Sequence, residues 1–190
     1  ILLMKISVIT VSLNSEKTIE KTINSVLSQN YKNFEYIIVD GKSDDKTLDV
    51  INKYKNKIDL VISEKDKGIF DAINKGIQRS SGDIISIIHS DDSFYDDKVL
   101  ETVNKNFIEK DNLECLIGIT LIKRKNSDFI VRKYNSSFFK KWMIYVGFTP
   151  PHPSTFIKKK VYDKIGFYKT DYEIAGDFDF FVRMFLKNKI

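Results

Sequence analysis

Residues 81–92 read S-G-D-I-I-S-I-I-H-S-D-D, and this stretch decides how the rest of the chain is interpreted. The run Asp83–Ile88 is rich in β-branched residues and follows a glycine, which is typical of a buried strand. The strand leads directly into Asp91 and Asp92. Two adjacent carboxylates repel each other, and a divalent cation would relieve that repulsion. A solvated turn before the next helix is the other interpretation of this pair.

The same alternation of strand and helix extends in both directions. Further strands are predicted at Lys5–Leu13, Glu35–Val39 and Asp59–Ser63, and helices at 19–27 with Ser15 as N-cap, Thr47–Tyr54, 69–79 and 99–107. Strands joined by crossover helices indicate a mostly parallel sheet with helices on both faces. The predicted fold class is therefore α/β.

After about residue 110 the alternation stops. Leu113–Lys123 and Asp128–Tyr134 are predicted to pair as a small antiparallel hairpin, followed by a short strand at Ser154–Ile157 and a helix at Phe178–Lys187. No linker or repeat separates the two parts. We expect a single domain, 1–190, with functional halves at 5–110 and 111–190.

Composition excludes several classes of protein. The 190 residues carry a net charge of +5, almost all of it from lysine, with only four arginines. Such a charge suits anionic small molecules or an anionic membrane surface, whereas sequence-specific nucleic-acid readers rely on arginine forks, so no nucleic-acid partner is expected. The single cysteine, Cys115, excludes a disulfide framework, and no secretory signal or membrane-spanning run is visible. These features favour a cytoplasmic setting.

The common nucleotide and nucleophile motifs are absent. The glycines form neither G-x-G-x-x-G nor G-x-x-x-x-G-K-[ST], and the two histidines accompany no nucleophile elbow. Instead, polar and acidic residues follow four predicted strands, at positions 10–14, 40, 64–66 and 91–92. Ligands of open α/β sheets bind at those carboxyl ends, so a binding site is predicted there.

Six stretches, taken together, resemble the family 2 glycosyltransferases, inverting enzymes with the GT-A fold, and in particular their bacterial polysaccharide-assembly branch. The stretches, in order, are I-S-V-I-T-V-S-L-N (6–14), Y-I-I-V-D-G-K-S-D-D-K-T (36–47), D-K-G-I-F-D-A-I-N-K-G-I (66–77), S-G-D-I-I-S-I-I-H-S-D-D (81–92), P-H-P-S-T-F (151–156) and A-G-D-F-D-F-F-V-R-M (175–184). They span nearly the whole chain. The resemblance implies a GT-A-like domain that holds a nucleotide-sugar in its first half.

The resemblance also implies roles for individual residues. Thr10, Ser12 and Asn14 would lie along the nucleotide cleft, Asp40 and Asp45 would contact base or ribose, and Asp66, Asp71, Asn74, Lys75 and Asp91 would border the ribose–diphosphate site. A UDP-sugar is the favoured donor.

The metal site differs from the strict Asp-x-Asp motif of the family, because His89 stands where the first acid would be. The resemblance makes Asp92 the direct ligand of a Mg²⁺ or Mn²⁺ ion, which would offset charge on the leaving diphosphate. His152, in the proline-bound loop, has two interpretations of equal weight. It is either a further metal ligand or phosphate contact, or a residue that stabilises the loop by a hydrogen bond.

Transfer also requires a base for the acceptor hydroxyl. Asp177, in A-G-D-F-D, aligns with the catalytic base of the family, while Asp179 is interpreted as a helix-start acid. The predicted activity is metal-dependent inverting transfer to a glycan or lipid-linked acceptor in surface-polysaccharide assembly. A sugar-nucleotide pyrophosphorylase and a non-catalytic sugar-nucleotide-binding protein are the alternatives. Related enzymes continue beyond the position of Ile190, so we expect part of the acceptor site to be missing.

One further feature is the aromatic–basic segment, Phe138–Phe148, with the lysines 158–160 beyond it. It is interpreted either as a helix that faces the core with solvated lysines, or as a face that contacts anionic lipid. The second interpretation places the protein at the inner face of a membrane. The sequence makes no prediction of oligomeric state.

Overall fold

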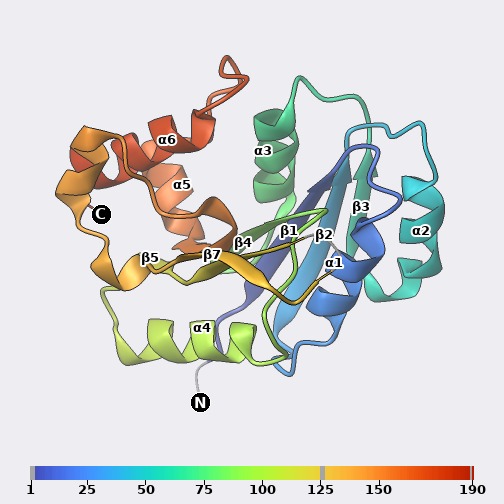
Figure 1. Ribbon diagram of the computed structural model, residues 1–190, viewed down its shortest axis with the longest axis horizontal. Helices are drawn as coiled ribbons and strands as arrows, with labels where there is room; N and C mark the ends of the chain where they lie inside the picture. The colour runs from blue at the N-terminus through green and yellow to red at the C-terminus, as the bar shows by residue number, and fades with distance from the viewer. Residues whose placement is uncertain (1–2, 125–126, 189) are drawn as a thin grey trace.

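The computed structural model describes residues 3–124, 127–188 and 190, and its centre is a six-stranded sheet (Figure 1). The strand order is β3-β2-β1-β4-β8-β5. The strands are β1 (Ile6–Ser12), β2 (Phe34–Asp40), β3 (Leu60–Ser63), β4 (Ile84–His89), β8 (Thr155–Lys158) and β5 (Cys115–Ile117). The first four are parallel, and β8 pairs antiparallel with both β4 and β5. The predicted α/β class with a mostly parallel sheet is confirmed.

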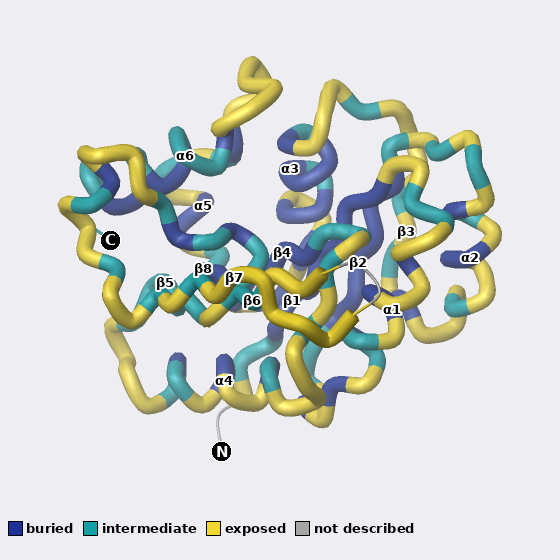
Figure 2. The backbone as a smooth tube through the Cα atoms, in the orientation of Figure 1, coloured by how far each residue is buried: buried dark blue, intermediate teal, exposed yellow. Residues whose placement is uncertain are grey.

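Helices cover both faces of the sheet because its strands are apolar on both sides. The helices are α1 (Ile19–Leu27), α2 (Thr47–Lys53), α3 (Ile69–Arg79), α4 (Val99–Glu109), α5 (Lys159–Ile165) and α6 (Gly176–Phe181), which continues as a π-helix (Val182–Lys187). One core lies between the sheet and α1, α2 and α4, and the other joins the sheet to α3, α5, α6 and the π-helix. Figure 2 shows β1 buried along its whole length between these layers, and β2 buried from its second residue onward.

Helix α1 begins at Ile19, as expected, but its N-cap is Thr18 and not Ser15. The backbone carbonyl of Ser15 accepts hydrogen bonds from the amides of Thr18 and Ile19, which form a turn before the helix. The Ser15 hydroxyl bonds instead to the hydroxyl of Ser90, 2.7 Å away, in the loop after β4. A contact between two loops has therefore replaced the local cap.

The predicted hairpin is only partly correct. Its paired strands are β6 (Thr120–Lys123) and β7 (Ile130–Tyr134), which form a separate antiparallel sheet. The first part of Leu113–Lys123 is β5, which joins the central sheet. The chain divides at Gly118, whose amide donates to the carbonyl of Ser154 beside β8. This long-range pairing ended the continuous strand that local pattern predicted.

The aromatic–basic segment is not a helix that faces the core. After a single 3₁₀ turn at Ser136–Phe138 it forms a second 3₁₀ helix, Lys141–Val146, which ends at Gly147 in the left-handed region with φ 83°. Most of its large side chains are exposed. Lysines 158–160 do not join this surface. They contact the ring of Phe107, the carbonyl of Ser80 and the carboxylate of Glu114, respectively.

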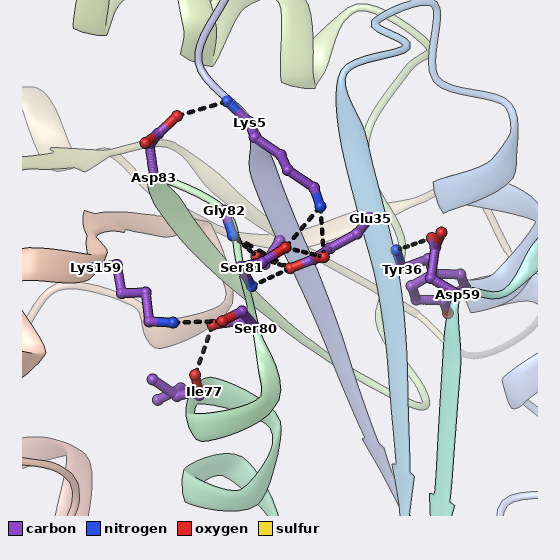
Figure 3. Close-up of polar contacts among 11 residues, drawn as sticks. Lys5, Glu35, Tyr36, Asp59, Ile77, Ser80, Ser81, Gly82, Asp83 and Lys159 are labelled. Carbon is purple, nitrogen blue, oxygen red and sulfur yellow. Dashed lines mark hydrogen bonds and ion pairs between the residues drawn. The ribbon is translucent and has the colours of Figure 1, made fainter.

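The amino ends of the parallel strands are held together by one carboxylate, Glu35 (Figure 3). It accepts hydrogen bonds from the ammonium of Lys5, the hydroxyl of Ser7 and the amide of Ser81. Burial by itself raises the pKa of Glu35, but these hydrogen bonds outweigh it and lower the pKa to about 2. The network ties β1, β2 and the turn before β4 together at the end opposite the predicted site.

Among the residues that the structure describes, no helix is both long enough and apolar enough to cross a bilayer.

Candidate active site

The carboxyl ends of β1, β2 and β4 lie side by side at one edge of the sheet (Figure 1). Ser12 is in register with Asp40, and Val11 with His89. The parallel pairing therefore brings together side chains that are about thirty to eighty residues apart, as the sequence predicts.

Asp40 accepts more hydrogen bonds from its surroundings than the other site candidates. Its side chain is fully buried and accepts hydrogen bonds from the hydroxyls of Ser12 at 3.3 Å, Ser43 at 2.5 Å and Ser63 at 2.9 Å. The amide of Ser43 donates a further bond at 2.9 Å. A buried carboxylate needs such donors because an unpaired one is costly. Asp40 is thus fixed at the end of β2 before any ligand arrives.

The loops after β1 and β2 are joined by Asn14 and Asp45. Asn14 adopts a left-handed conformation, and its side-chain carbonyl accepts a hydrogen bond from the amide of Asp44. Asp45 accepts bonds from the Thr47 hydroxyl and from the amides of Thr47 and Glu16. Partial burial raises the pKa of Asp45, but these bonds outweigh it and lower the pKa below its usual value. Both residues shape the rim of the site.

Asp66 and the start of α3 form the next part of the edge. A side chain at Gly41 would have its Cβ only 2.6 Å from Asp66 Oδ2, so the glycine allows this carboxylate to lie against the end of β2. Lys75 pairs with Asp71 at 3.3 Å and with Glu64 at 3.0 Å. This partly exposed cluster places one ammonium group between two carboxylates.

Two of the predicted contacts are engaged inside the protein. Thr10 is fully buried, and its hydroxyl lies 3.0 Å from that of Tyr36. Asn74 is also buried, and its amide bonds to both the backbone carbonyl and the backbone amide of Tyr168. Neither side chain reaches the edge of the sheet in this conformation, so neither is available to a donor there.

Asp91 is exposed and Asp92 is partly buried, both directly after β4. Burial raises the pKa of Asp92, as does the charge of Asp91, while His89 acts in the opposite direction. No side chain of a described residue donates a hydrogen bond to the Asp92 carboxylate. Within residues 3–124, 127–188 and 190, no three histidine, cysteine, aspartate or glutamate side chains are grouped to hold a metal ion.

A donor set of one or two carboxylates still suits Mg²⁺ or Mn²⁺, since such ions commonly take their other ligands from water and substrate phosphates. The unengaged carboxylate of Asp92 fits that arrangement. Asp91 lies beside it and could contribute a second oxygen.

His152 is buried in the loop before β8. Its Nε2 shares a 2.7 Å hydrogen bond with the hydroxyl of Tyr168, and its ring lies 5.8 Å from that of His89. Burial lowers the pKa of His152 to about 3, helped by the nearby His89, so the ring is neutral at pH 7. The hydrogen bond expected of a loop-stabilising residue is present. In the tautomer whose Nε2 donates this bond, Nδ1 keeps its lone pair and can act as a ligand.

Asp177 and Asp179 have different surroundings although both lie in the first turn of α6. Asp179 pairs with Lys169 at 2.9 Å and with Arg183 at 2.7 Å. Asp177 accepts a bond from the amide of Phe178 and forms no ion pair with any described residue. The carboxylate of Asp177 therefore remains available, and that of Asp179 does not.

A cavity of about 270 Å³ lies between the start of α3 and the loop before α6. Its lining residues are Lys67, Gly68, Ile69, Phe70, Asp71, Thr170, Tyr172 and Glu173. Sequence reasoning missed the second-half residues of this cavity, as well as Ser43, Ser63 and Tyr168. Ser43 follows Asp40 so closely that a turn serine could have been suspected, but no local pattern distinguishes the others.

Comparison with known proteins identifies the family and the fold of this chain. The family described as Glycosyl transferase family 2 matches residues 7–184. The uncharacterized glycosyltransferase Rv1514c of Mycobacterium tuberculosis is 30% identical over 186 residues, which cover 94% of this chain and 68% of that protein. The putative teichuronic acid biosynthesis glycosyltransferase TuaG of Bacillus subtilis is 38% identical over 97 residues, covering 50% of this chain and 38% of its own length.

Solved structures show the same fold. S. aureus TarS 1-349 aligns with a TM-score of 0.77 at 27% identity, covering 96% of this chain. A complex of that protein with UDP-GlcNAc aligns with a TM-score of 0.75 at 26% identity, again over 96% of this chain and over 54% of TarS 1-349. The chain thus spans about two thirds of Rv1514c and about half of the TarS chain.

Proposed function

The chain belongs to glycosyl transferase family 2, and on that premise we propose that it transfers a sugar, with inversion, from a nucleoside-diphosphate sugar to a hydroxyl group of a glycan or lipid-linked acceptor. The observation that supports this proposal most is that Asp40 and Asp92 follow the neighbouring parallel strands β2 and β4, while α6, which carries the unpaired Asp177, packs through Gly176 against Phe70 at the start of α3. The chain is similar to TuaG, which is named as a putative glycosyltransferase of teichuronic acid biosynthesis. This similarity supports surface polysaccharide as the product class.

The nucleoside is assigned to the end of β2, with Ser12, Asn14 and Asp45 around it. Asp40 is buried and bonded to three serines, so it would accept hydrogen bonds from base or ribose hydroxyls in place of one of these serines. A UDP-sugar is the favoured donor, since TarS has been solved with UDP-GlcNAc and with UDP. Asp66, Asp71 and Lys75 would border the diphosphate.

The diphosphate would share a Mg²⁺ or Mn²⁺ ion with Asp92, assisted by Asp91 and by His152. When bound, such an ion offsets the negative charge that grows on the leaving nucleoside diphosphate. Because burial keeps His152 neutral, its ring does not compete with that ion by positive charge.

Asp177 is assigned as the general base. The acceptor oxygen attacks the anomeric carbon and forms the new glycosidic bond, while its proton passes to the Asp177 carboxylate. The bond from the anomeric carbon to the diphosphate oxygen breaks, and its electron pair leaves with the nucleoside diphosphate. Attack from the side opposite the leaving group inverts the configuration at that carbon.

Analysis of products tests this function. The protein is incubated with UDP-, GDP- and TDP-sugars, Mn²⁺ and a panel of lipid-linked and free glycans, and both released nucleotide and glycoside are measured. Glycosyl transfer predicts nucleoside diphosphate and an inverted glycoside in equal amounts. Reaction of the nucleotide-sugar with radiolabelled pyrophosphate to give sugar 1-phosphate and a labelled nucleoside triphosphate would instead indicate a pyrophosphorylase. Binding without any product would indicate a non-catalytic protein.

A further inference from the structure

The aromatic–basic segment presents large side chains to solvent while it is itself anchored to the core. Trp142 is 61% exposed, Tyr145 76% and Val146 72%. Ile144, within the same turn, is only 1% exposed. The ring of Phe139 packs 5.4 Å from that of Phe185 in the π-helix. The exposed side chains thus stand on a short, fixed platform on the half of the molecule that carries Asp177.

The charge of this platform is entirely positive. Residues 136–148 contain Lys140 and Lys141 and no acidic residue. Both lysines are exposed, and neither forms an ion pair with any residue in the described part of the chain. An exposed apolar patch with unpaired charge of one sign marks an interaction surface.

We propose that the aromatic–basic segment docks the protein on an anionic lipid surface. Tryptophan and tyrosine favour the boundary between lipid headgroups and acyl chains, because each has an apolar body with a polar group. Lysines beside them attract anionic headgroups. Glycan acceptors carried on lipid would then be presented to the same half of the molecule.

The charge argues against a second copy of the chain as the occupant. A twofold contact places the same patch on both subunits. Lys140 and Lys141 of one copy would then face the same lysines of the other without an acid between them. An anionic membrane removes that repulsion, whereas self-association increases it.

The segment contains the only tryptophan of the chain, so emission excited at wavelengths that tyrosine does not absorb reports on this surface alone. The protein is titrated with vesicles of phosphatidylcholine and with vesicles of phosphatidylcholine and phosphatidylglycerol in equal parts, at low salt. We expect a blue shift of Trp142 emission and protection from acrylamide only with the anionic vesicles. Salt should reverse both, because the screening length falls from about 10 Å at 0.1 M to about 3 Å at 1 M.

Two variants retain the fluorescent reporter. Lys140→Gln with Lys141→Gln should weaken vesicle binding by about fivefold per lysine. Tyr145→Ser with Val146→Ser should weaken it by about tenfold or more, through lost apolar burial. Far-UV circular dichroism and thermal shift with UDP-sugar show whether each variant keeps its fold and its donor site.

Matched controls lie elsewhere on the surface. Tyr95 is 77% exposed, so Tyr95→Ser removes a similar aromatic group outside the segment. Lys53→Gln with Lys55→Gln removes two exposed lysines near the end of α2, on the side of the molecule opposite the segment (Figure 1). Both controls should bind vesicles like the wild type.

The proposal is overturned if anionic vesicles at low salt leave Trp142 emission unchanged, or if the controls lose as much binding as the segment variants. It is also overturned if Trp142 becomes protected without lipid as protein concentration rises, since a second copy would then cover the patch. Donor binding and product formation are measured separately, so failure here leaves the proposed transfer reaction untouched.

Discussion

At the scale of single residues, Asp177 and Asp179 show that neighbouring charges decide whether an aspartate can accept a proton. They are two positions apart on α6, yet only Asp179 is held by Lys169 and Arg183. A carboxylate already paired with two cations is a weak proton acceptor, because its charged form is stabilised. Accordingly, the same two cations lower the pKa of Asp179 despite its partial burial.

Asp177→Asn is therefore expected to lower kcat by about 10²–10⁴-fold, the usual contribution of a positioned base. Donor affinity, measured by calorimetry with UDP-sugar and Mn²⁺, should stay near the wild-type value because Asp177 is not among the residues proposed to hold the donor or its metal ion. Asp179→Asn is the matched control. It should lower the melting temperature, because two ion pairs are lost, and it should change kcat far less than Asp177→Asn does. Full turnover in Asp177→Asn, with turnover lost in Asp179→Asn, would reverse the assignment.

Glu35 leads to a prediction about stability at low pH. Its folded-state pKa of about 2 lies below its ordinary 4.5, so the ionised form stabilises the folded protein. That stabilisation, on the order of 2–3 kcal/mol, is complete above about pH 5 and is lost as pH falls toward 2. Urea unfolding of wild type and Glu35→Gln should therefore differ at pH 7 and converge near pH 2.

The control for this experiment is Glu101→Gln, because Glu101 is exposed on α4 and has no hydrogen-bond partner among the described side chains. If the free energies of unfolding of wild type and Glu35→Gln differed by the same amount from pH 7 to pH 2, the network would stabilise the fold through packing and not through the charge of Glu35.

At the scale of elements, the placement of Asp177 depends on how closely α6 approaches α3. A Cβ at Gly176 would lie 2.6–2.8 Å from ring atoms of Phe70, so the first turn of α6 can pack there only with glycine. Phe70 in turn stacks on Tyr168 with ring centroids 5.8 Å apart. This contact joins the helix that carries the candidate base to the helix proposed to border the donor site.

Gly176→Ala should destabilise the protein by about 1–3 kcal/mol, as overpacking of a core contact does. It should also lower kcat, because α6 must move away from α3. Phe70→Leu removes ring atoms from the contact, so the double variant should be less destabilised than the sum of the two single variants. If the losses in free energy of unfolding of the two single variants simply added in the double variant, the two residues would not compete for the same space.

At the scale of the whole molecule, one apolar core contains residues from both expected halves. Ile9, Ile37 and Ile73 from the first half pack in the same cluster as Phe180 and Met184 from the second. Two halves that share a core are expected to unfold together. The single-domain organisation is still a prediction, and unfolding tests it.

Denaturant unfolding followed by Trp142 fluorescence and by far-UV circular dichroism should give coincident transitions. Fluorescence reports on the second half and circular dichroism on all helices, so agreement indicates one cooperative unit. Two separated midpoints would show instead that residues 5–110 form an independent domain.

The sequence by itself determined the parallel strands, the helices between them and the polar residues at the strand ends. These features follow from local rules: β-branched runs make strands, apolar residues at helical spacing make amphipathic helices, and acids after a strand lie at its carboxyl end. This is why β1, β2, β3 and β4 lie within a residue or two of their predicted bounds. It is also why Asp40 and Asp92 can be recognised from sequence as carboxylates at strand ends.

Only the tertiary structure decided which of these side chains are free to act. Asn74 is engaged by Tyr168, which lies 94 residues further along the chain, and β5 left the predicted hairpin to pair with β8. The same holds for the pairing of Asp179 with Lys169, which leaves Asp177 unpaired, and for the exposure of Trp142. Contacts of this kind depend on where distant segments meet in space, and no local period or spacing encodes that meeting.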